Sequence, residues 1–305
     1  MIEIRELFKS YGDTQALAGL SFDVAEGEIF GLLGPNGAGK TTTISIIAGL
    51  LSPDSGTVRV AGLDIRKEGP RVRGMLGVVP QEIALYEELT GRENLHFWGS
   101  LYGLSGRRLR ADAGRVLELV GLAERADDRV REYSGGMKRR LNLSAGLIHR
   151  PRVILLDEPT LGIDPQARIS ILDIVRDGVS EGMTAIYTTH YLEEAEKLCD
   201  RIAIVDHGKI LAEGTLDELV KLAGEGNLVT IRGGFTRERM GPLLTGANVE
   251  HLEDDTLRVQ VTGQSELGAM LTRIFSAGIR VEDVSIKEPS LEGVFIKLTG
   301  RELRD

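Results

Sequence analysis

The hydrophobic pattern of the first 222 residues alternates between short apolar runs and amphipathic stretches. Continuous apolar runs bounded by turn residues are typical of strands that are buried on both faces. Such runs occur at 29–33, 75–79, 153–156 and 183–188. Because predicted helices follow the first three of these runs, the pattern favours an α/β fold.

Two further patterns modify this picture. Met1–Val24 alternates between apolar and polar positions, which predicts edge strands, and 202–213 is typical of a hairpin with its turn at Asp206–Gly208. Between about residues 88 and 150 the pattern is helical, starting with the capping box Thr90–Glu93 and interrupted by glycines. We therefore expect an antiparallel β edge subdomain and an α-helical insert within the α/β domain.

The last third of the chain has a different order of elements. A short capped helix is expected at 215–222, and the glycine-rich segment 224–227 is typical of a linker. From residue 228 the pattern predicts strand, helix, strand, strand, helix, strand and a final helix. This order indicates a small α+β, ferredoxin-like domain at 228–305, after a larger α/β domain at 1–222. A regulatory or dimerising role and a simple packing module fit this accessory domain equally well.

The composition argues against several functions. The 305 residues are 42% hydrophobic and 27% charged, which is typical of a globular protein, and the net charge of −9 argues against nucleic acid as the partner. Cys199 is the single cysteine, so we expect no internal disulfide and a reducing cytoplasm. The first residues lack the apolar core of a signal peptide, and no stretch of ~18 or more apolar residues is present to span a membrane. A transmembrane function would therefore need a pore from another chain.

The strongest candidate site follows the first apolar run. The segment GPNGAGKTT contains the pattern G-x-x-x-x-G-K-[ST] between a predicted strand and a predicted helix, which disfavours a plain glycine turn. Glycines let backbone N–H groups turn toward a phosphate, and the helix start adds further N–H groups and a positive dipole end. Lys40 is expected to reach the β- and γ-phosphates, and the Thr41 hydroxyl to bind Mg²⁺. The candidate nucleotide-binding residues are Gly34, Pro35, Asn36, Gly37, Ala38, Gly39, Lys40, Thr41 and Thr42.

Two other apolar runs end in side chains that suit phosphate chemistry. Asp157 and Glu158 directly follow the run 153–156, and His190 lies just beyond the run 183–188. Because α/β sheets bind ligands at the carboxyl ends of parallel strands, we expect these side chains at the same edge as the glycine loop. Asp157 is a candidate Mg²⁺ ligand, directly or through water, and Glu158 a candidate for polarising the attacking water. His190 is a candidate contact of the γ-phosphate, although a lone histidine is more often structural.

Three further features are ambiguous when each is considered alone. Tyr11 is either an aromatic that stacks on a nucleotide base or a half-buried loop residue. Gln81, just past a predicted strand, is either a contact of a metal ion or water, or a solvated loop residue. Ser134, with Gly135 and Gly136, either caps the following helix or forms a second anion site.

Together, these segments resemble the ATPase subunit of an ABC transporter. Seven elements occur in that family's order over about the first 220 residues, which is far more specific than any one of them. In order, they are Tyr11 (A-loop), GPNGAGKTT (Walker A), Gln81 (Q-loop), Tyr133–Met137 (signature motif), VILLDEP with Glu158 in the catalytic position (Walker B), Asp164 (D-loop) and His190 (switch histidine). The resemblance therefore favours the functional interpretations of Tyr11, Gln81 and Ser134.

The resemblance implies a P-loop NTPase that binds and hydrolyses ATP. It implies Mg²⁺ as the cofactor, with Thr41, Gln81 and Asp157 as its contacts, catalysis by Glu158 assisted by His190 and Gln81, and Asp164 among the residues around the nucleotide. Two copies, or one copy and a similar ATPase subunit, would face head to tail and enclose ATP between the phosphate loop of one and the signature motif of the other. The expected partner is an integral membrane permease, which would hold the chain at the cytoplasmic face of the cell membrane.

The sequence departs from the commonest family patterns at two places. The signature reads YSGGM rather than LSGGQ, which keeps the serine and both glycines, and Leu161 stands where the D-loop often has serine. The segment YSGGMKRRL and the tail PSLEGVFIKLTGRELRD resemble the branch that exports drugs, lipids or polysaccharides. Export is therefore expected rather than import.

Two other functions remain as alternatives. A soluble ABC protein that acts on ribosomes or DNA usually carries two cassettes or a coiled-coil insert, and this acidic chain has one cassette and no such insert. A non-catalytic binding subunit would have a degenerate site, whereas Lys40, Asp157, Glu158 and His190 are all present. The transported substrate and the choice between homodimer and heterodimer cannot be derived from these residues.

Overall fold

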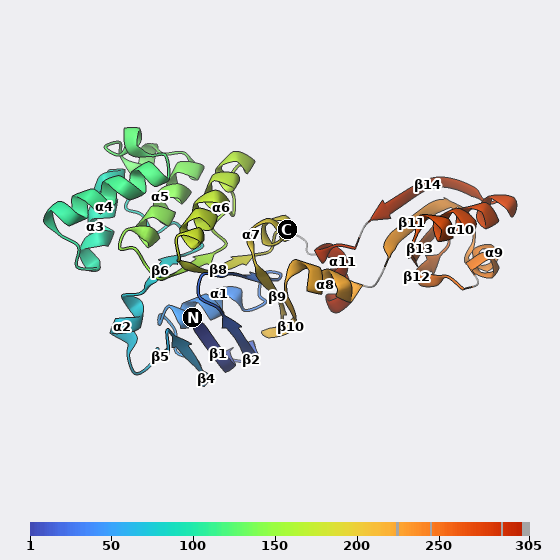
Figure 1. The fold of residues 1–305 in the computed structure, drawn as a ribbon, viewed down its shortest axis with the longest axis horizontal. Coiled ribbons are helices and arrows are strands. Elements are labelled where there is room, and N and C mark those ends of the chain that lie inside the picture. The colour runs from blue at the N-terminus through green and yellow to red at the C-terminus, as the bar shows by residue number, and fades with distance from the viewer. Residues whose placement is uncertain (224–225, 245, 288, 301–305) are drawn as a thin grey trace. The chain divides into compact units, whose positions relative to one another are not determined.

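The computed structural model describes residues 1–300 except 224–225, 245 and 288 (Figure 1). The chain divides into two compact units, the first formed by Met1–Thr215 and the second beginning at Leu216. The division precedes the helix at 216–223, whereas the domain boundary expected from the sequence follows it. The predicted glycine-rich linker falls partly outside the described residues, at 224–225. No helix within the described residues has the length and apolar character needed to cross a membrane.

The first unit is built on a six-stranded sheet with the strand order β10-β9-β3-β8-β7-β6. Neighbouring strands are parallel except for β10, which pairs antiparallel with β9 at the edge. The strands are β3 (Ile29–Leu33), β6 (Leu76–Val79), β7 (Val153–Asp157), β8 (Thr184–Thr189), β9 (Arg201–Asp206) and β10 (Lys209–Gly214). The four predicted apolar runs are confirmed as the adjacent strands β3, β8, β7 and β6, so their carboxyl ends share one edge.

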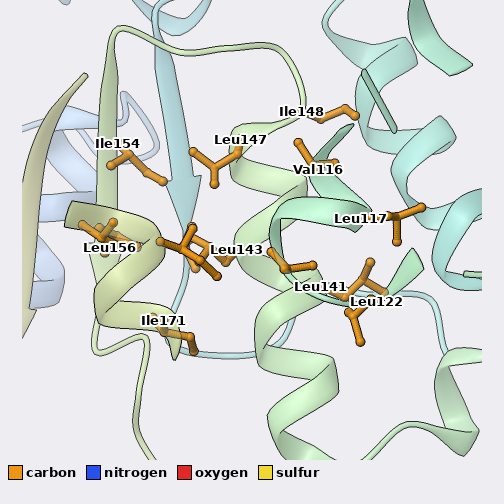
Figure 2. Packing of buried hydrophobic residues seen from close by; sticks show 14 of the residues in the cluster. Val116, Leu117, Leu122, Leu141, Leu143, Leu147, Ile148, Ile154, Leu156 and Ile171 are labelled. Atoms are coloured by element: carbon orange, nitrogen blue, oxygen red, sulfur yellow. The ribbon is translucent and has the colours of Figure 1, made fainter. Parts of the chain in front are cut away.

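Alternate side chains of these strands enter two separate hydrophobic cores. In β7, Ile154 and Leu156 belong to the core that is shared with the helical insert, while Val153 and Leu155 belong to the core on the other face. Figure 2 shows Ile154 and Leu156 beside Leu143 of the insert. The uninterrupted aliphatic run in the sequence therefore reflects a strand that is covered on both faces.

A four-stranded antiparallel sheet forms the predicted edge subdomain. Its strand order is β2-β1-β4-β5, and its strands are β1 (Ile2–Tyr11), β2 (Thr14–Val24), β4 (Ser55–Val60) and β5 (Leu63–Asp64). The short helices α1 (Lys40–Ile47) and α2 (Gly69–Arg73) follow β3 and β5 in the chain. Tyr11 was expected in a loop but is the last residue of β1 and pairs with Thr14, because the hairpin turn is only two residues long. The helix predicted after the glycine loop begins at Lys40, within the segment GPNGAGKTT, with Gly39 as its N-cap.

The helical insert is confirmed and gathers at one end of the first unit (Figure 1). It contains α3 (Gly91–Leu101), α4 (Gly106–Leu119), two 3-10 turns (Ala123–Arg125 and Val130–Glu132) and α5 (Gly135–Leu147). The capping box at Thr90 is present, with Thr90 Oγ1 accepting from the Glu93 N–H and the Glu93 carboxylate accepting from the Thr90 N–H. Two more helices, α6 (Pro165–Ser180) and α7 (Leu192–Leu198), follow β7 and β8.

The second unit contains the predicted ferredoxin-like arrangement. Its four strands are all antiparallel with the order β12-β13-β11-β14, which is the order of a split-βαβ sheet. Its elements are α8 (Leu216–Ala223), β11 (Asn227–Gly234), α9 (Arg237–Met240) with a 3-10 turn (Gly241–Leu244), β12 (Asn248–Glu253), β13 (Thr256–Val261), α10 (Gln264–Ser276), β14 (Arg280–Lys287) and α11 (Leu291–Thr299). The single helix expected after the first strand of this domain is therefore an α-helix followed by a 3-10 turn.

Candidate nucleotide site

The carboxyl ends of four adjacent strands carry the predicted site residues. The glycine loop follows β3, His190 follows β8, Asp157 ends β7 and Gln81 lies two residues beyond β6. This placement confirms that segments up to about 150 residues apart in sequence meet at one edge of the sheet, where α/β folds bind ligands.

The glycine loop lies very close to neighbouring backbone at both of its ends. The Gly34 N–H donates to the Thr189 carbonyl at 3.3 Å, and a Cβ on Gly34 would lie 2.1 Å from the Val205 carbonyl oxygen. Gly39 has a φ of 101°, and its Cβ would lie 2.6 Å from the Ala16 carbonyl oxygen. Neither position therefore accepts a side chain.

The helix that follows the loop has a glycine as its N-cap residue. α1 begins at Lys40, and among the described residues its N-cap Gly39 provides no side-chain oxygen to accept a hydrogen bond from the first turn. Its first N–H groups therefore remain to bind an anion, and the helix dipole favours negative charge at this point.

Three buried side chains form a continuous polar chain beside the loop. Lys40 Nζ donates to the carbonyls of Gly34 at 2.6 Å and Pro35 at 3.0 Å, and it lies 3.1 Å from Glu158 Oε1. The other carboxylate oxygen of Glu158 lies 2.9 Å from His190 Nδ1. The structure thus brings the predicted phosphate-binding lysine into direct contact with one predicted catalytic residue, and that residue into contact with a second.

Glu158 is strained and ionised. Its φ of 44° lies in the left-handed region, which costs a non-glycine residue about 1–3 kcal/mol, and its N–H is held by Thr188 through both the hydroxyl and the carbonyl. Burial alone would raise the pKa of Glu158, but the hydrogen bond to His190 and the charge of Lys40 outweigh it and lower that pKa. The carboxylate is therefore ionised at neutral pH and able to orient a water molecule.

A hydroxyl and a carboxylate that were both predicted to contact Mg²⁺ lie together. The Thr41 hydroxyl lies near enough to Asp157 to lower the pKa of that carboxyl, and Asp157 Oδ1 accepts from the Thr188 hydroxyl at 2.7 Å. Burial raises the pKa of Asp157, although both hydroxyls act against that rise. No group of three or more His, Cys, Asp or Glu residues suited to a metal occurs within the described chain. Mg²⁺ sites on nucleotides do not need one, because phosphates and water supply most of their ligands.

Gln81 and Tyr11 lie near the site without joining the polar chain. In the part of the chain that the structure describes, the Gln81 side chain makes no hydrogen bond, and only its carbonyl is engaged, by Arg139. Tyr11 is 52% exposed, with Lys9 Nζ 5.8 Å from its ring centroid, and it ends the first strand of the hairpin whose second strand brings Ala16 against Gly39. Stacking of this exposed ring on a base stays a prediction.

The second candidate anion site shares no hydrogen bond with the first among the described residues. Ser134 caps α5 by accepting from the Met137 N–H at 3.2 Å, which leaves its hydroxyl proton to donate. Gly135 and Gly136 form the first turn, and a Cβ on Gly136 would lie 2.9 Å from the Ala167 side chain. Across the described residues, no hydrogen bond joins this turn to the glycine loop.

Asp164 lies beside the Ser134 turn rather than beside the glycine loop. Its carboxylate caps α6 by accepting from the N–H groups of Gln166 at 3.1 Å and Ala167 at 3.0 Å. Because Ala167 packs against Gly136, the starts of α5 and α6 lie side by side. The structure therefore groups Ser134, Gly135, Gly136 and Asp164 together.

Sequence reasoning missed a buried carboxylate behind the site. Glu194 of α7 accepts from the hydroxyls of Thr160 at 2.6 Å, Thr189 at 2.8 Å and Tyr187 at 2.9 Å, and it lies 3.3 Å from Arg168 Nε. These bonds tie the segment after Glu158 to the strand before His190. The sequence signal was a run of hydroxyl-bearing residues, but their common partner is visible only once β7 and β8 are paired.

The first unit combines three features: a strand, a glycine loop with a buried lysine, and a second helix that begins with glycines. Together they define a P-loop ATPase of the ABC type. The family model described as ABC transporter matches residues 17–161. The chain is 43% identical to the Linearmycin resistance ATP-binding protein LnrL of Bacillus subtilis (strain 168), with 100% of both chains covered. It is 40% identical to the Nod factor export ATP-binding protein I of Paraburkholderia xenovorans (strain LB400), with 100% of this chain and 98% of the relative covered. The chain belongs to the ATP-binding subunits of the ABC transporter family.

Solved structures agree with this assignment. A structure titled as the ATP binding subunit of an ABC transporter matches with a TM-score of 0.66 and 32% identity, over 72% of this chain and 92% of that one. A dimeric post-hydrolysis structure of the ATP-binding cassette MJ0796 with ADP and Pi matches with a TM-score of 0.65 and 27% identity, over 70% of this chain and 98% of that one. The chain therefore binds and hydrolyses ATP.

Proposed function

We propose that this ATPase powers an exporter whose pore is a separate integral membrane permease. The permease would hold the ATPase at the cytoplasmic face of the membrane. The relatives named for linearmycin resistance and for Nod factor export support export of a drug-, lipid- or saccharide-like molecule. Neither name points to ribosomes or DNA, so the soluble alternative has no support from them. Residues 1–222 would form the ATPase domain and 228–305 an accessory domain.

The observation that carries this proposal is the polar chain Lys40–Glu158–His190 at the sheet edge. Lys40 would turn from Glu158 to the β- and γ-phosphates of ATP. Its departure removes one of the charges that lower the pKa of Glu158, so this carboxylate becomes a better acceptor for a proton from the attacking water. His190 would then hold the γ-phosphate and hydrogen-bond Glu158.

The oxygen ligands at the same edge fit Mg²⁺. The Thr41 hydroxyl lies near Asp157, and Gln81 lies two residues beyond the end of the neighbouring strand β6. A divalent cation there would neutralise charge on the β- and γ-phosphates. The cation would also lower the pKa of Asp157, against the effect of burial, and keep this carboxylate ionised.

The pairing of two separate anion sites supports a dimer. The glycine loop and the turn at Ser134 lie on one unit, and no hydrogen bond joins them among the described residues, so each is a separate half-site. A two-fold axis would place the glycine loop of each copy opposite the Ser134 turn of the other copy, and so complete both sites. The related cassette MJ0796 was solved as a dimer, which supports a homodimer or a heterodimer with a similar subunit here. Hydrolysis would remove the γ-phosphate between the halves and separate them.

Replacing Ser134 by Glu is expected to abolish ATP-induced dimerisation without loss of ATP binding. A carboxylate at this helix start would face the γ-phosphate of the opposing copy and weaken the dimer by ~10-fold or more, about 1.4 kcal/mol. Light scattering in a Glu158→Gln background would measure the dimer, and a fluorescent ATP analogue the affinity. Ser105→Glu is the matched control, because Ser105 is also an exposed N-cap residue, on α4. A dimer unchanged by Ser134→Glu contradicts the shared site.

A cavity of about 280 Å³ offers a place for the permease to dock. It is lined mainly by apolar side chains from the end of α1, from β6 and from α3 and α5: Ala48, Leu50, Arg73, Leu76, Val78, Pro80, Ala84, Trp98, Tyr102, Asn142 and Ala145. Pro80 and Ala84 lie on either side of Gln81, so an occupant would touch the segment that is proposed to contact Mg²⁺. We propose that a short helix from a cytoplasmic loop of the permease occupies this cavity.

A peptide with the sequence of that permease loop is expected to change the fluorescence of Trp98 in a saturable way. Trp98 is the single tryptophan, lines the cavity and donates its indole N–H to the Ala84 carbonyl at 3.1 Å. Leu50→Glu, at the rim of the cavity, should abolish the change, whereas Leu119→Glu on α4 should not. A peptide that binds in a polarisation assay without altering Trp98 emission would place the contact elsewhere.

A further inference from the structure

A buried arginine on α5 connects two loops of the site. Arg139 is 6% exposed, and its guanidinium donates to the Gln81 carbonyl at 2.5 Å and to the Leu161 carbonyl at 3.3 Å. Gln81 follows β6, and Leu161 lies between Glu158 and the cap residue Asp164. One side chain of the helix that Ser134 caps therefore touches the backbone of both loops.

The rest of the segment after β6 is fastened to the same helical insert. Asn142, one turn after Arg139, accepts from the Ala84 N–H at 3.1 Å and donates to the Pro80 carbonyl at 3.4 Å. Trp98 donates to the Ala84 carbonyl at 3.1 Å. Within the described chain, each side chain that bonds the backbone of 80–86 comes from α3 or α5. A displacement of this segment must therefore be transmitted to the insert.

Arg139 is buried, so its two hydrogen bonds are needed to offset the loss of water around its guanidinium. Burial lowers the pKa of Arg139, and the charge of Glu158 opposes that effect. In the described residues no carboxylate lies within ion-pair distance of the guanidinium, so two carbonyls compensate its desolvation. The planar fork of arginine reaches two acceptors on different loops at once, which the point charge of lysine does not.

We propose that Arg139 is a positioning residue that couples the Gln81 segment to the Leu161 loop and to the helix of the signature motif. This role rests on the proposed functions of Gln81 and Ser134. When Gln81 shifts toward Mg²⁺ and the γ-phosphate, Arg139 carries the shift to the starts of α5 and α6. These two starts form the half-site for the opposing copy. The occupancy of one nucleotide site is thereby communicated to the other.

The adjacent residue offers a matched control. Arg140 lies on the same helix, and its Nη1 donates to the Val120 carbonyl at 2.7 Å. That contact remains inside the insert and reaches neither loop of the site. Arg139→Lys and Arg140→Lys therefore make the same chemical change at positions that differ in what they connect.

The test compares both lysine variants with the unsubstituted chain in ATP affinity, kcat and ATP-induced dimerisation. Arg139→Lys is expected to keep the affinity of the monomer for a fluorescent ATP analogue within ~2-fold, and to lower kcat by ~10-fold or more. It should also weaken the dimer formed in the Glu158→Gln background. Arg140→Lys should leave all three within ~2-fold. A kcat for Arg139→Lys within ~2-fold of the unsubstituted value, or an equal loss in Arg140→Lys, overturns the proposal.

Hydrogen exchange distinguishes coupling from general destabilisation. Arg139→Lys, or Arg139→Gln if the lysine variant does not fold, should speed amide exchange at 81–86 and 161–164 together while β3 keeps its protection. Faster exchange throughout the first unit would overturn the proposal. Failure of the unsubstituted chain to dimerise with ATP would overturn the proposed function as well. With dimerisation intact, a normal kcat in Arg139→Lys removes only the role of Arg139.

Discussion

Glu158→Gln is expected to lower the kcat of ATP hydrolysis by at least ~100-fold while ATP binding is retained, because loss of a positioned general base typically costs 10²–10⁴-fold. Glutamine has the same shape and can still hydrogen-bond His190 and Lys40, so the geometry around the γ-phosphate should persist. It cannot accept the proton of the attacking water. Phosphate release measured at saturating ATP would give kcat, and a fluorescent ATP analogue would give the affinity.

The same substitution is expected to trap an ATP-bound dimer. Loss of the carboxylate charge also frees Lys40 from its ion pair, so ATP affinity should stay equal or rise. Light scattering with and without ATP would detect the dimer. Glu193→Gln is a suitable control, because Glu193 is an exposed glutamate at the start of α7. Turnover within a few-fold of the unsubstituted chain would show that Glu158 is not the catalytic group.

The parts of the site that the sequence predicted are those set by local chemistry. The glycine loop, Asp157 and His190 each follow an apolar run, and the rule that parallel strands end at one edge was enough to bring them together. The ferredoxin-like order of the second unit was likewise predictable, because its strands and helices differ in hydrophobic period.

The parts that the sequence did not predict depend on contacts between distant segments. The Thr188 hydroxyl donates to the Asp157 carboxylate and accepts from the Glu158 N–H. Both hydrogen bonds follow from the register of β7 against β8, and no local sequence pattern predicts them. Arg139 carries no signal of its own in the sequence, because its acceptors are backbone carbonyls of other segments. Backbone acceptors carry no sequence signal, so such residues appear only in three dimensions.

Lys40→Ala is expected to weaken ATP binding by ~10-fold to ~100-fold, since hydrogen bonds to charged groups contribute about 1.5–3 kcal/mol. The ammonium is the one positive side chain that contacts the carbonyls of Gly34 and Pro35, among the described residues, and it is buried beside the predicted phosphate position. The substitution removes that charge and leaves the N–H groups of the loop in place. Titration with a fluorescent ATP analogue in the Glu158→Gln background would measure the affinity without hydrolysis.

Lys40→Ala separates two roles of the lysine, as a ligand of phosphate and as a partner of Glu158. If Lys40 only neutralised Glu158, its removal would let burial raise the pKa of Glu158 and would change the pH dependence of kcat, while the ATP affinity stayed the same. If Lys40 holds the phosphates, affinity falls in the Glu158→Gln background too, where no carboxylate remains to be neutralised. Lys197→Ala, an exposed lysine on α7, controls for loss of one positive charge. An unchanged affinity in Lys40→Ala would therefore reject the loop at 34–42 as the triphosphate site, whatever happened to kcat.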